Sequence, residues 1–344
     1  MRDSSAPAPA PRFLTFTFDV DRLHCPGIMH MSLCLLVLDD IAVELNRTPL
    51  LFPANQHVCT VNSSDYENGV RGEPKFGQYS NYYPPEDATW SRYFNLDEAF
   101  VAKGALENRT LWESASRLAR NNSYPTKGVK VMDPTVPLSK LQMVEESILA
   151  LKFYNGWAKD HYNTDCLLGE EIAPTNPTRE RVSPGGMRQI SLQPSATVKR
   201  IALRIAKKLD FNFAMIHLRR GDSLNNQLNY LGASARRVFS TTSPKHVTKV
   251  MASLNATHLP IIIMTNEQSG RYLNAMNRLL PTVIWEWELP QVRRLREKHS
   301  DNIEIFQMLR YLGYLAKIRV GTSKCYFYKG RCDSLLATDG FELS

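Results

Sequence analysis

The chain has 344 residues, of which 43% are hydrophobic and 22% are charged, a composition that excludes a disordered or fibrous protein. Its length is enough for two domains of ordinary size. The formal net charge of +8 suits an anionic ligand, a nucleic acid or solubility alone. The basic clusters carry no aromatic interleaving, zinc-finger spacing or helix-turn-helix pattern, so we expect no nucleic-acid partner. Two clusters are expected on exposed helix or loop faces: Lys207/Lys208 and Arg293/Arg294/Arg296.

The amino-terminal half has an irregular pattern. Residues 13–18 alternate apolar side chains with threonine, which predicts a strand, and a helix is expected over residues 28–45. A strand follows at residues 49–52. Residues 53–137 are rich in Asn, Tyr, Pro and Gly and predict long loops. Residues 138–157 return to a helical spacing of apolar side chains.

The carboxy-terminal half alternates helical segments with short apolar runs. Helices are expected at residues 195–209, 244–254, 270–280 and 302–316. Strands are expected at residues 211–218, 260–264, 282–285 and 317–320. Short strands that are apolar throughout indicate a parallel sheet covered on both faces. The sequence therefore predicts an α/β, Rossmann-like domain in this half.

A linker is predicted between the two halves. Residues 174–186 contain Pro-Thr-Asn-Pro and end in Ser-Pro-Gly-Gly, a composition typical of loops. We therefore expect two domains, at residues 12–186 and 195–333.

Three of the predicted strands end in polar clusters. These are His217-Leu218-Arg219-Arg220-Gly221-Asp222, Thr265-Asn266-Glu267 and Gly321-Thr322-Ser323-Lys324. Because ligands of open α/β sheets bind outside the carboxyl ends of the strands, the three clusters are expected to converge on one site.

The chemistry of the first cluster points to a phosphate-bearing ligand. Two arginines that leave a buried strand carry a desolvation penalty unless an anion meets them, and the guanidinium fork matches phosphate oxygens. Gly221 allows a close approach of the backbone, and Asp222 can hold an arginine or reach a sugar hydroxyl. His217 gains weight as a ligand contact because it shares a strand face with Arg219. The alternative is a structural Arg–Asp pair at the end of the strand.

The remaining features bear on metals, redox state and compartment. There is no Cys-x-x-Cys pair and no histidine spacing typical of zinc, so we expect no metal. Cys325 and Cys332 either close a small loop or stay as free thiols. No segment reaches the ~18 apolar residues of a membrane span, and no anchor or signal is visible. Sequons for N-glycosylation begin at Asn46, Asn62, Asn108, Asn121 and Asn255, an excess that favours the secretory pathway, in the ER or Golgi lumen.

The His-x-Arg-Arg-Gly-Asp cluster resembles the donor motif of the GDP-fucose fucosyltransferases, which include the protein O-fucosyltransferases and the α-1,6-fucosyltransferases. The run from Gly27-Ile28-Met29-His30 into Leu45-Asn46-Arg47-Thr48 is similar to the first motif of this family. Met264-Thr265-Asn266-Glu267 and the segment 301–322 are similar to later segments of its plant and algal branch. The likeness covers residues 24–53 and 196–333.

This resemblance implies a GT-B-like architecture, in which two Rossmann-like domains face a cleft that holds the donor without a metal or other cofactor. It implies inverting transfer of fucose from GDP-fucose to a hydroxyl of a protein or glycan acceptor. Arg219 would be catalytic, holding the β-phosphate and stabilising the charge of the leaving group. Donor-binding roles are implied for His217, Arg220, Gly221, Asp222, Thr265, Asn266, Glu267, Thr322 and Ser323, and a place in the cleft for Gly27 and His30.

The sequence departs from the family pattern at two places. His30 stands where the first motif has an asparagine, and Leu309 stands near the carboxylate that reads guanine, for which Glu304 is a candidate substitute. His30 and Glu267 are the candidates for the general base. These departures keep two other functions open: a catalytically degenerate relative that binds nucleotide or glycan, and a transferase for another nucleotide sugar.

Overall fold

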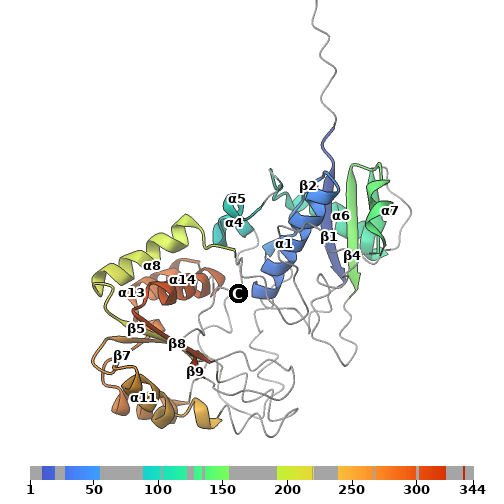
Figure 1. Ribbon diagram of the computed structural model, residues 1–344. Coiled ribbons are helices and arrows are strands. Elements are labelled where there is room, and N and C mark those ends of the chain that lie inside the picture. The colour runs from blue at the N-terminus through green and yellow to red at the C-terminus, as the bar shows by residue number, and fades with distance from the viewer. Residues whose placement is uncertain are drawn as a thin grey trace, which may run out of the picture. The chain divides into compact units, whose positions relative to one another are not determined.

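The computed structural model describes residues 10–19, 28–54, 88–100, 102, 104–121, 128–133, 136–154, 192–218, 220, 239–265, 267, 269–299, 302–322 and 336–337. The described chain divides into two compact units, the first ending at Gln193 and the second beginning at Pro194. Each unit contains a sheet of parallel strands with helices packed on it (Figure 1). The expected α/β class is therefore confirmed, whereas the expected cleft between the two domains stays a prediction.

The first unit is built on a sheet with the strand order β2-β1-β4-β3, and every pair in it is parallel. Its strands are β1 (Phe13–Asp19), β2 (Thr48–Pro49), β3 (Val129–Met132) and β4 (Ile148–Tyr154). Its helices are α1 (Ile28–Glu44), α4 (Trp90–Tyr93), α5 (Leu96–Ala99), α6 (Arg109–Asn121) and α7 (Leu138–Gln142). Helix α6 packs on β1, β3 and β4 through a small core that includes Ala115 and Ala150.

The second unit is built on a sheet with the strand order β7-β6-β5-β8-β9, of which only the β8–β9 pair is antiparallel among the described residues. Its strands are β5 (Ala214–Leu218), β6 (Ile261–Thr265), β7 (Val283–Trp285), β8 (Ile318–Thr322) and β9 (Leu336–Ala337). Its helices are α8 (Ala196–Lys208), α11 (Pro244–Ser253), α12 (Gly270–Leu279), the 3₁₀ turn η3 (Glu286–Glu288), α13 (Pro290–His299) and α14 (Asn302–Leu315).

Helices cover both faces of this second sheet, as its apolar strands predicted. Side chains that alternate along β5 and β6 point to opposite faces. Met215 and Ile262 pack with α8, α13 and α14, whereas Ile216 and Ile263 pack with α11 and α12. In Figure 1, α8, α13 and α14 accordingly lie on one side of the strands and α11 lies on the other. The strands are thus buried on both faces, which leaves their ends as the places where polar side chains can meet.

Two predictions for the first unit are wrong. The segment 138–157 is not one helix, because α7 ends at Gln142 and the apolar run Ile148–Tyr154 forms β4, a central strand between β1 and β3. The predicted loops of 53–137 include α6, which buries Trp112 and Ala115, and the strand β3. The predicted linker, 174–186, lies outside the described residues.

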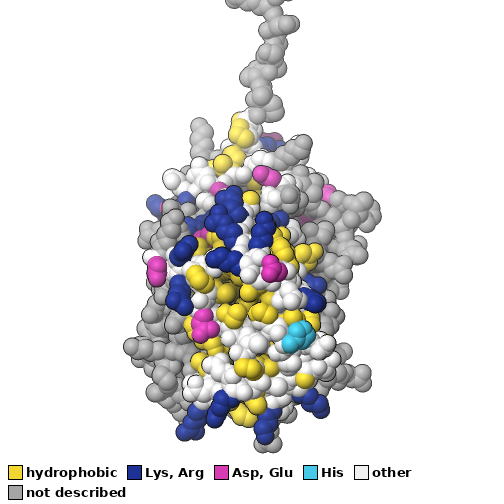
Figure 2. All heavy atoms as spheres, turned by 90° about the vertical axis from the view of Figure 1, so that its left-hand side faces the viewer, with side chains coloured by type: hydrophobic (Ala, Val, Ile, Leu, Met, Phe, Trp, Pro, Cys, Tyr) yellow, Lys and Arg dark blue, Asp and Glu magenta, His cyan; other side chains and the backbone are white. Residues whose placement is uncertain are grey.

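The exposed basic residues lie where the sequence predicted them. Lys207 and Lys208 on α8 and Arg293 and Arg294 on α13 are exposed. Figure 2, turned to the side of the molecule on which these helices are labelled in Figure 1, shows Lys and Arg side chains among hydrophobic and neutral ones. Within the described residues, no helix is long and apolar enough to cross a bilayer.

Candidate functional site

The carboxyl ends of three neighbouring parallel strands lie side by side in the second unit. Strand β5 pairs with β6 on one side, with Leu218 opposite Thr265. It pairs with β8 on the other side, with His217 opposite Gly321. The three strands that precede the predicted polar clusters are therefore neighbours in one sheet, and their carboxyl ends share one edge.

The structure describes part of the predicted site. The side chains of His217, Arg220, Thr265 and Glu267 are described, whereas Thr322 and His30 are described only as the end of β8 and the first turn of α1. The predicted residues that lie outside the described structure are Gly27, Arg219, Gly221, Asp222, Asn266 and Ser323.

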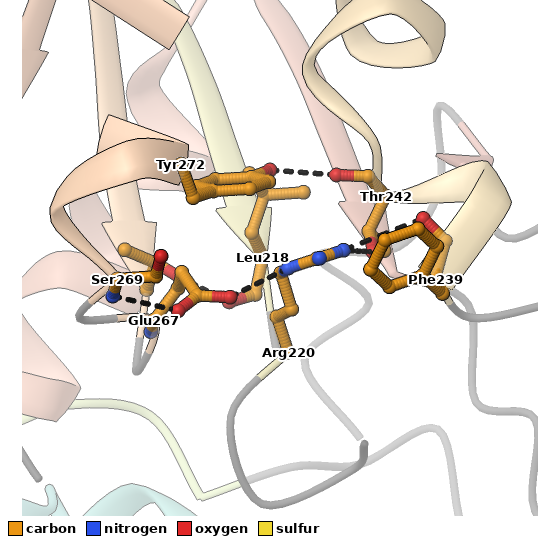
Figure 3. A network of polar contacts seen from close by, with 8 residues as sticks. Leu218, Arg220, Phe239, Thr242, Glu267, Ser269 and Tyr272 are labelled. Atoms are coloured by element: carbon orange, nitrogen blue, oxygen red, sulfur yellow. Dashed lines mark hydrogen bonds and ion pairs between the residues drawn. The ribbon is translucent and has the colours of Figure 1, made fainter. Parts of the chain in front are cut away.

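Arg220 lies in a buried polar network just beyond the end of β5 (Figure 3). Its Nε donates to Glu267 Oε2 at 2.6 Å, and the two side chains are only 6% and 12% exposed. Its Nη1 donates to Thr242 Oγ1 at 2.6 Å and to the carbonyl oxygen of Phe239 at 3.4 Å. The guanidinium is therefore paired with a carboxylate and fixed by two neighbouring acceptors.

Two aromatic rings pack against the same guanidinium. Its Cζ lies 4.5 Å from the ring centroid of Tyr272 and 4.9 Å from that of Phe239. The Tyr272 hydroxyl donates to the carbonyl oxygen of Thr242 at 2.6 Å. Burial raises the pKa of Tyr272 far above its ordinary value of 10.0, although the positive charge of Arg220 acts in the opposite direction. Tyr272 is therefore a neutral hydroxyl donor at physiological pH.

The end of β6 joins the network through Thr265 and Glu267. Thr265 Oγ1 donates to the carbonyl oxygen of Leu218 at 2.7 Å and accepts from the backbone N–H of Glu267 at 3.0 Å. Glu267 Oε1 accepts from the N–H of Ser269, the residue that precedes α12, at 2.8 Å. Both carboxylate oxygens of Glu267 therefore have partners within the protein.

This geometry revises the sequence-based picture of the arginine cluster. Arg220 and Glu267, both of which we predicted to bind the donor, contact each other. The alternative expected from the sequence was a structural Arg–Asp pair at the end of the strand, whereas the pair that the structure describes there joins Arg220 to Glu267. Whether either side chain also touches a donor stays a prediction. The sequence did not predict the other three residues of the network, Phe239, Thr242 and Tyr272. No fixed spacing relates them to the His-x-Arg-Arg-Gly-Asp motif.

His217 and the start of α14 lie on the other side of the sheet. His217 is half-buried and follows Met215 by two positions, so it shares the face covered by α8, α13 and α14. Leu309 is fully buried in the core on this face, which excludes it as a contact to a nucleobase. Glu304 lies in the first turn of α14 and is 6% exposed. Because α14 leads into β8 through two residues and returns along the sheet, its amino terminus lies towards the carboxyl edge.

In the first unit, the Leu-Asn-Arg-Thr segment (residues 45–48) forms the turn after α1 and contributes a buried arginine. Asn46 adopts a left-handed conformation (φ 48°) just after α1, and Arg47 is buried behind it. Arg47 donates to the carbonyl oxygens of Phe13 at 3.1 Å, Glu146 at 2.9 Å and Val144 at 2.5 Å. Burial lowers the pKa of Arg47 to about 10, helped by the charge of Arg12. Arg47, which directly precedes β2, therefore joins the start of β1 to the segment before β4.

The described residues contain no group of three or more His, Cys, Asp or Glu side chains that could hold a metal ion. Cys34, buried in α1, is disulfide-bonded. Cys325 and Cys332, the pair considered in the sequence, lie outside the described structure.

Comparisons with known proteins give matches only among solved structures. No family model and no curated protein matches the chain. A crystal structure of POFUT1 in complex with GDP is similar with a TM-score of 0.44 and 12% identity, over 90% of this chain and 90% of that chain. A crystal structure of the fucosyltransferase NodZ from Bradyrhizobium is similar with a TM-score of 0.37 and 11% identity, over 92% of this chain and 96% of that chain.

Proposed function

We propose that the protein is a glycosyltransferase that moves fucose from GDP-fucose to a hydroxyl of a protein or glycan acceptor, with inversion and without a metal. The observation that carries this proposal is the common edge of β5, β6 and β8, where three polar clusters follow adjacent parallel strands. An arginine-rich edge of this kind suits a diphosphate, because fixed guanidinium and backbone donors match its oxygens.

In this proposal the diphosphate is bound by Arg219 together with Thr322 and Ser323, and His217 contacts the nucleotide. Helices α11 and α12 follow β5 and β6, so their amino termini are directed to the same edge. The positive dipole ends of these helices favour an anion there. Gly221, Asp222 and Asn266 are expected beside the donor.

The reaction needs one bond formed and one broken. The acceptor hydroxyl oxygen bonds to fucose C1 while the bond between C1 and the β-phosphate oxygen breaks, and the electron pair leaves with GDP. Arg219 stabilises the charge that grows on the departing phosphate. The hydroxyl proton passes to a base. Glu267 already accepts hydrogen bonds with both oxygens, so we favour His30, beside Gly27 in the first motif, for this role.

Calorimetry with GDP, UDP and GDP-fucose tests the proposal. We expect GDP to bind and GDP-fucose to be turned over with an acceptor, with full activity in EDTA. Arg219→Ala should lose about 1.5–3 kcal/mol of GDP binding, which is about 10- to 150-fold in affinity, and should lose turnover. The control is Arg109→Ala, which breaks an exposed ion pair with Glu113 on α6 and should leave GDP binding unchanged. An unimpaired Arg219→Ala enzyme would contradict the proposed mechanism.

A second function is favoured by one observation. Leu309 is in the core and stands near the position where the fucosyltransferases that the sequence resembles carry the guanine-reading carboxylate. This favours a relative that binds a nucleotide or glycan without catalysis, or one that uses a different nucleotide sugar. GDP binding without turnover would establish the former, and tighter binding of UDP the latter. Glu304→Gln separates these from our proposal, because loss of the preference for GDP would assign the reading of guanine to Glu304.

We further propose that the protein works in the lumen of the secretory pathway. The disulfide of Cys34 supports this, because structural disulfides persist in oxidising compartments. The sequons at Asn108 and Asn255 also support it, since both asparagines are exposed. The disulfide state of Cys34 and the glycosylation of Asn255 test this proposal.

A further inference from the structure

The Arg220 network joins three chain segments that are far apart in the sequence. Arg220 follows β5, Glu267 follows β6, and Phe239 and Thr242 precede α11. Arg220 lies at the start of the connection between β5 and α11, and Phe239 and Thr242 lie near its end. The hydrogen bonds from Arg220 to these two residues therefore join the two ends of the connection. The network therefore sets the relative positions of three backbone segments at this edge of the sheet.

We propose that Arg220 and Glu267 are a positioning pair, which acts on the donor by holding Arg219 and the neighbouring backbone in place and not by contacting the donor. The inference rests on the proposed function, since it concerns the same site. It divides the two arginines of the motif into a ligand-binding residue, Arg219, and a structural one, Arg220.

The division follows from geometry and charge. The Arg220 guanidinium is paired with Glu267 at 2.6 Å and packed against the rings of Tyr272 and Phe239, and it is 5% exposed as a residue. A buried ion pair has no net charge to offer a diphosphate.

Glu267→Gln distinguishes positioning from direct contact, because the two roles predict opposite changes in the affinity for GDP. If Arg220 bound the diphosphate directly, removing the Glu267 charge would release the guanidinium and reduce repulsion of the anion, so GDP would bind as well or better. If the pair positions Arg219, loss of the ion pair lets the backbone at the ends of β5 and β6 move, and GDP binds more weakly.

The experiment measures GDP and GMP affinities of the wild type, Glu267→Gln, Arg220→Gln and the double variant. We expect each single change to weaken GDP binding on the order of tenfold, with little change for GMP, and the double variant to be no weaker than either single variant. In turnover, kcat should fall while KM for the acceptor stays constant. Tighter GDP binding by Glu267→Gln, or additive losses in the double variant, would overturn the positioning pair.

A matched control separates this effect from the general loss of an ion pair. Arg109→Gln removes an Arg–Glu pair of similar length, 2.7 Å, that is exposed on α6, and it should leave both affinities unchanged. Should Arg220→Gln fail to fold, Arg220→Lys replaces it. Lysine keeps the charge but lacks the planar fork, so it should also weaken GDP binding.

Hydrogen exchange of the unliganded protein tests whether Arg220 holds the neighbouring backbone in place, independently of any activity. In Arg220→Gln the backbone N–H groups of Glu267 and Ser269 should exchange faster, whereas those of α8 should not change. If the wild type binds no GDP, the proposed function is rejected. Hydrogen exchange alone would then decide whether Arg220 holds the backbone near Glu267 and Ser269 in place. Unchanged exchange at Glu267 and Ser269 would reject the pair as a positioning device.

Discussion

Tyr272 allows the energy of the buried network to be measured without removing a charge. Tyr272→Phe deletes the hydroxyl that donates to the carbonyl oxygen of Thr242 at 2.6 Å, and it keeps a ring against Arg220. Tyr272→Leu removes the hydroxyl and the ring together. The two variants therefore separate the hydrogen bond from the cation–π contact.

The structure gives a magnitude for each change. Tyr272 is 6% exposed, so the lost hydrogen bond and the unsatisfied carbonyl of Thr242 should cost about 1–2 kcal/mol. In a unit of this size that corresponds to a fall of about 2–8 °C in Tm. The leucine variant also loses the contact with the guanidinium, which adds about 0.5–2 kcal/mol. Tyr314→Phe on α14, where the side chain is 52% exposed, should stay within about 0.5 kcal/mol of the wild type.

Urea unfolding measures these free energies, and its pH dependence adds a second test. Burial raises the pKa of Tyr272 above its ordinary value of 10.0, so the unfolded chain releases this proton at a lower pH than the folded one. The contribution of Tyr272 is therefore complete below pH 10 and declines as the pH rises further. The difference in the free energy of unfolding between the wild type and Tyr272→Phe should therefore become smaller above pH 10. Equal stability of the two proteins at pH 7, or a leucine variant no weaker than the phenylalanine one, would refute this account.

Three further predictions concern other parts of the chain. Arg47→Lys should lower the free energy of unfolding by about 2–4 kcal/mol, because an ammonium does not reach three separate carbonyl oxygens; a smaller loss in urea unfolding than in the surface variant Lys207→Ala would contradict this. Peptide mapping without reduction should find Cys34 in a disulfide, and labelling of Cys34 by a thiol reagent in denaturant would exclude it. Asn255→Gln should remove one glycan from protein secreted by eukaryotic cells, seen as a mass difference that disappears after deglycosylation, and an unchanged mass would show that the site is not used.

The second unit was predictable because its strands are short apolar runs between helices. Residues 211–218 were expected to form one strand, whereas β5 begins at Ala214. The difference has a local cause: Asp210 and Phe211 have φ angles of 50° and 54° as the chain turns out of α8, and such residues cannot extend a strand. The boundary is therefore set by backbone conformation, which the apolar pattern does not report.

Strand β4 shows why the first unit was harder to predict. Its residues, Ile-Leu-Ala-Leu-Lys-Phe-Tyr, are apolar on both faces apart from Lys152, and such a run has no period that separates a strand from a buried helix. The helical spacing of α7 just before it made a longer helix the simpler interpretation. The deciding factor is pairing with β1 and β3, a non-local effect that a single sequence does not contain.

The two arginines of the motif illustrate the same limit at the level of function. The sequence indicates that an anion must accompany them, and this argument holds for Arg220, but the anion is the carboxylate of Glu267, 47 residues further along the chain. The motif alone could not distinguish a phosphate from an internal acid, since both satisfy a buried guanidinium. Two of the clusters that we expected to bind one ligand thus partly bind each other. In our proposal a diphosphate at this edge is therefore bound through Arg219, while the Arg220 network holds the neighbouring backbone segments together.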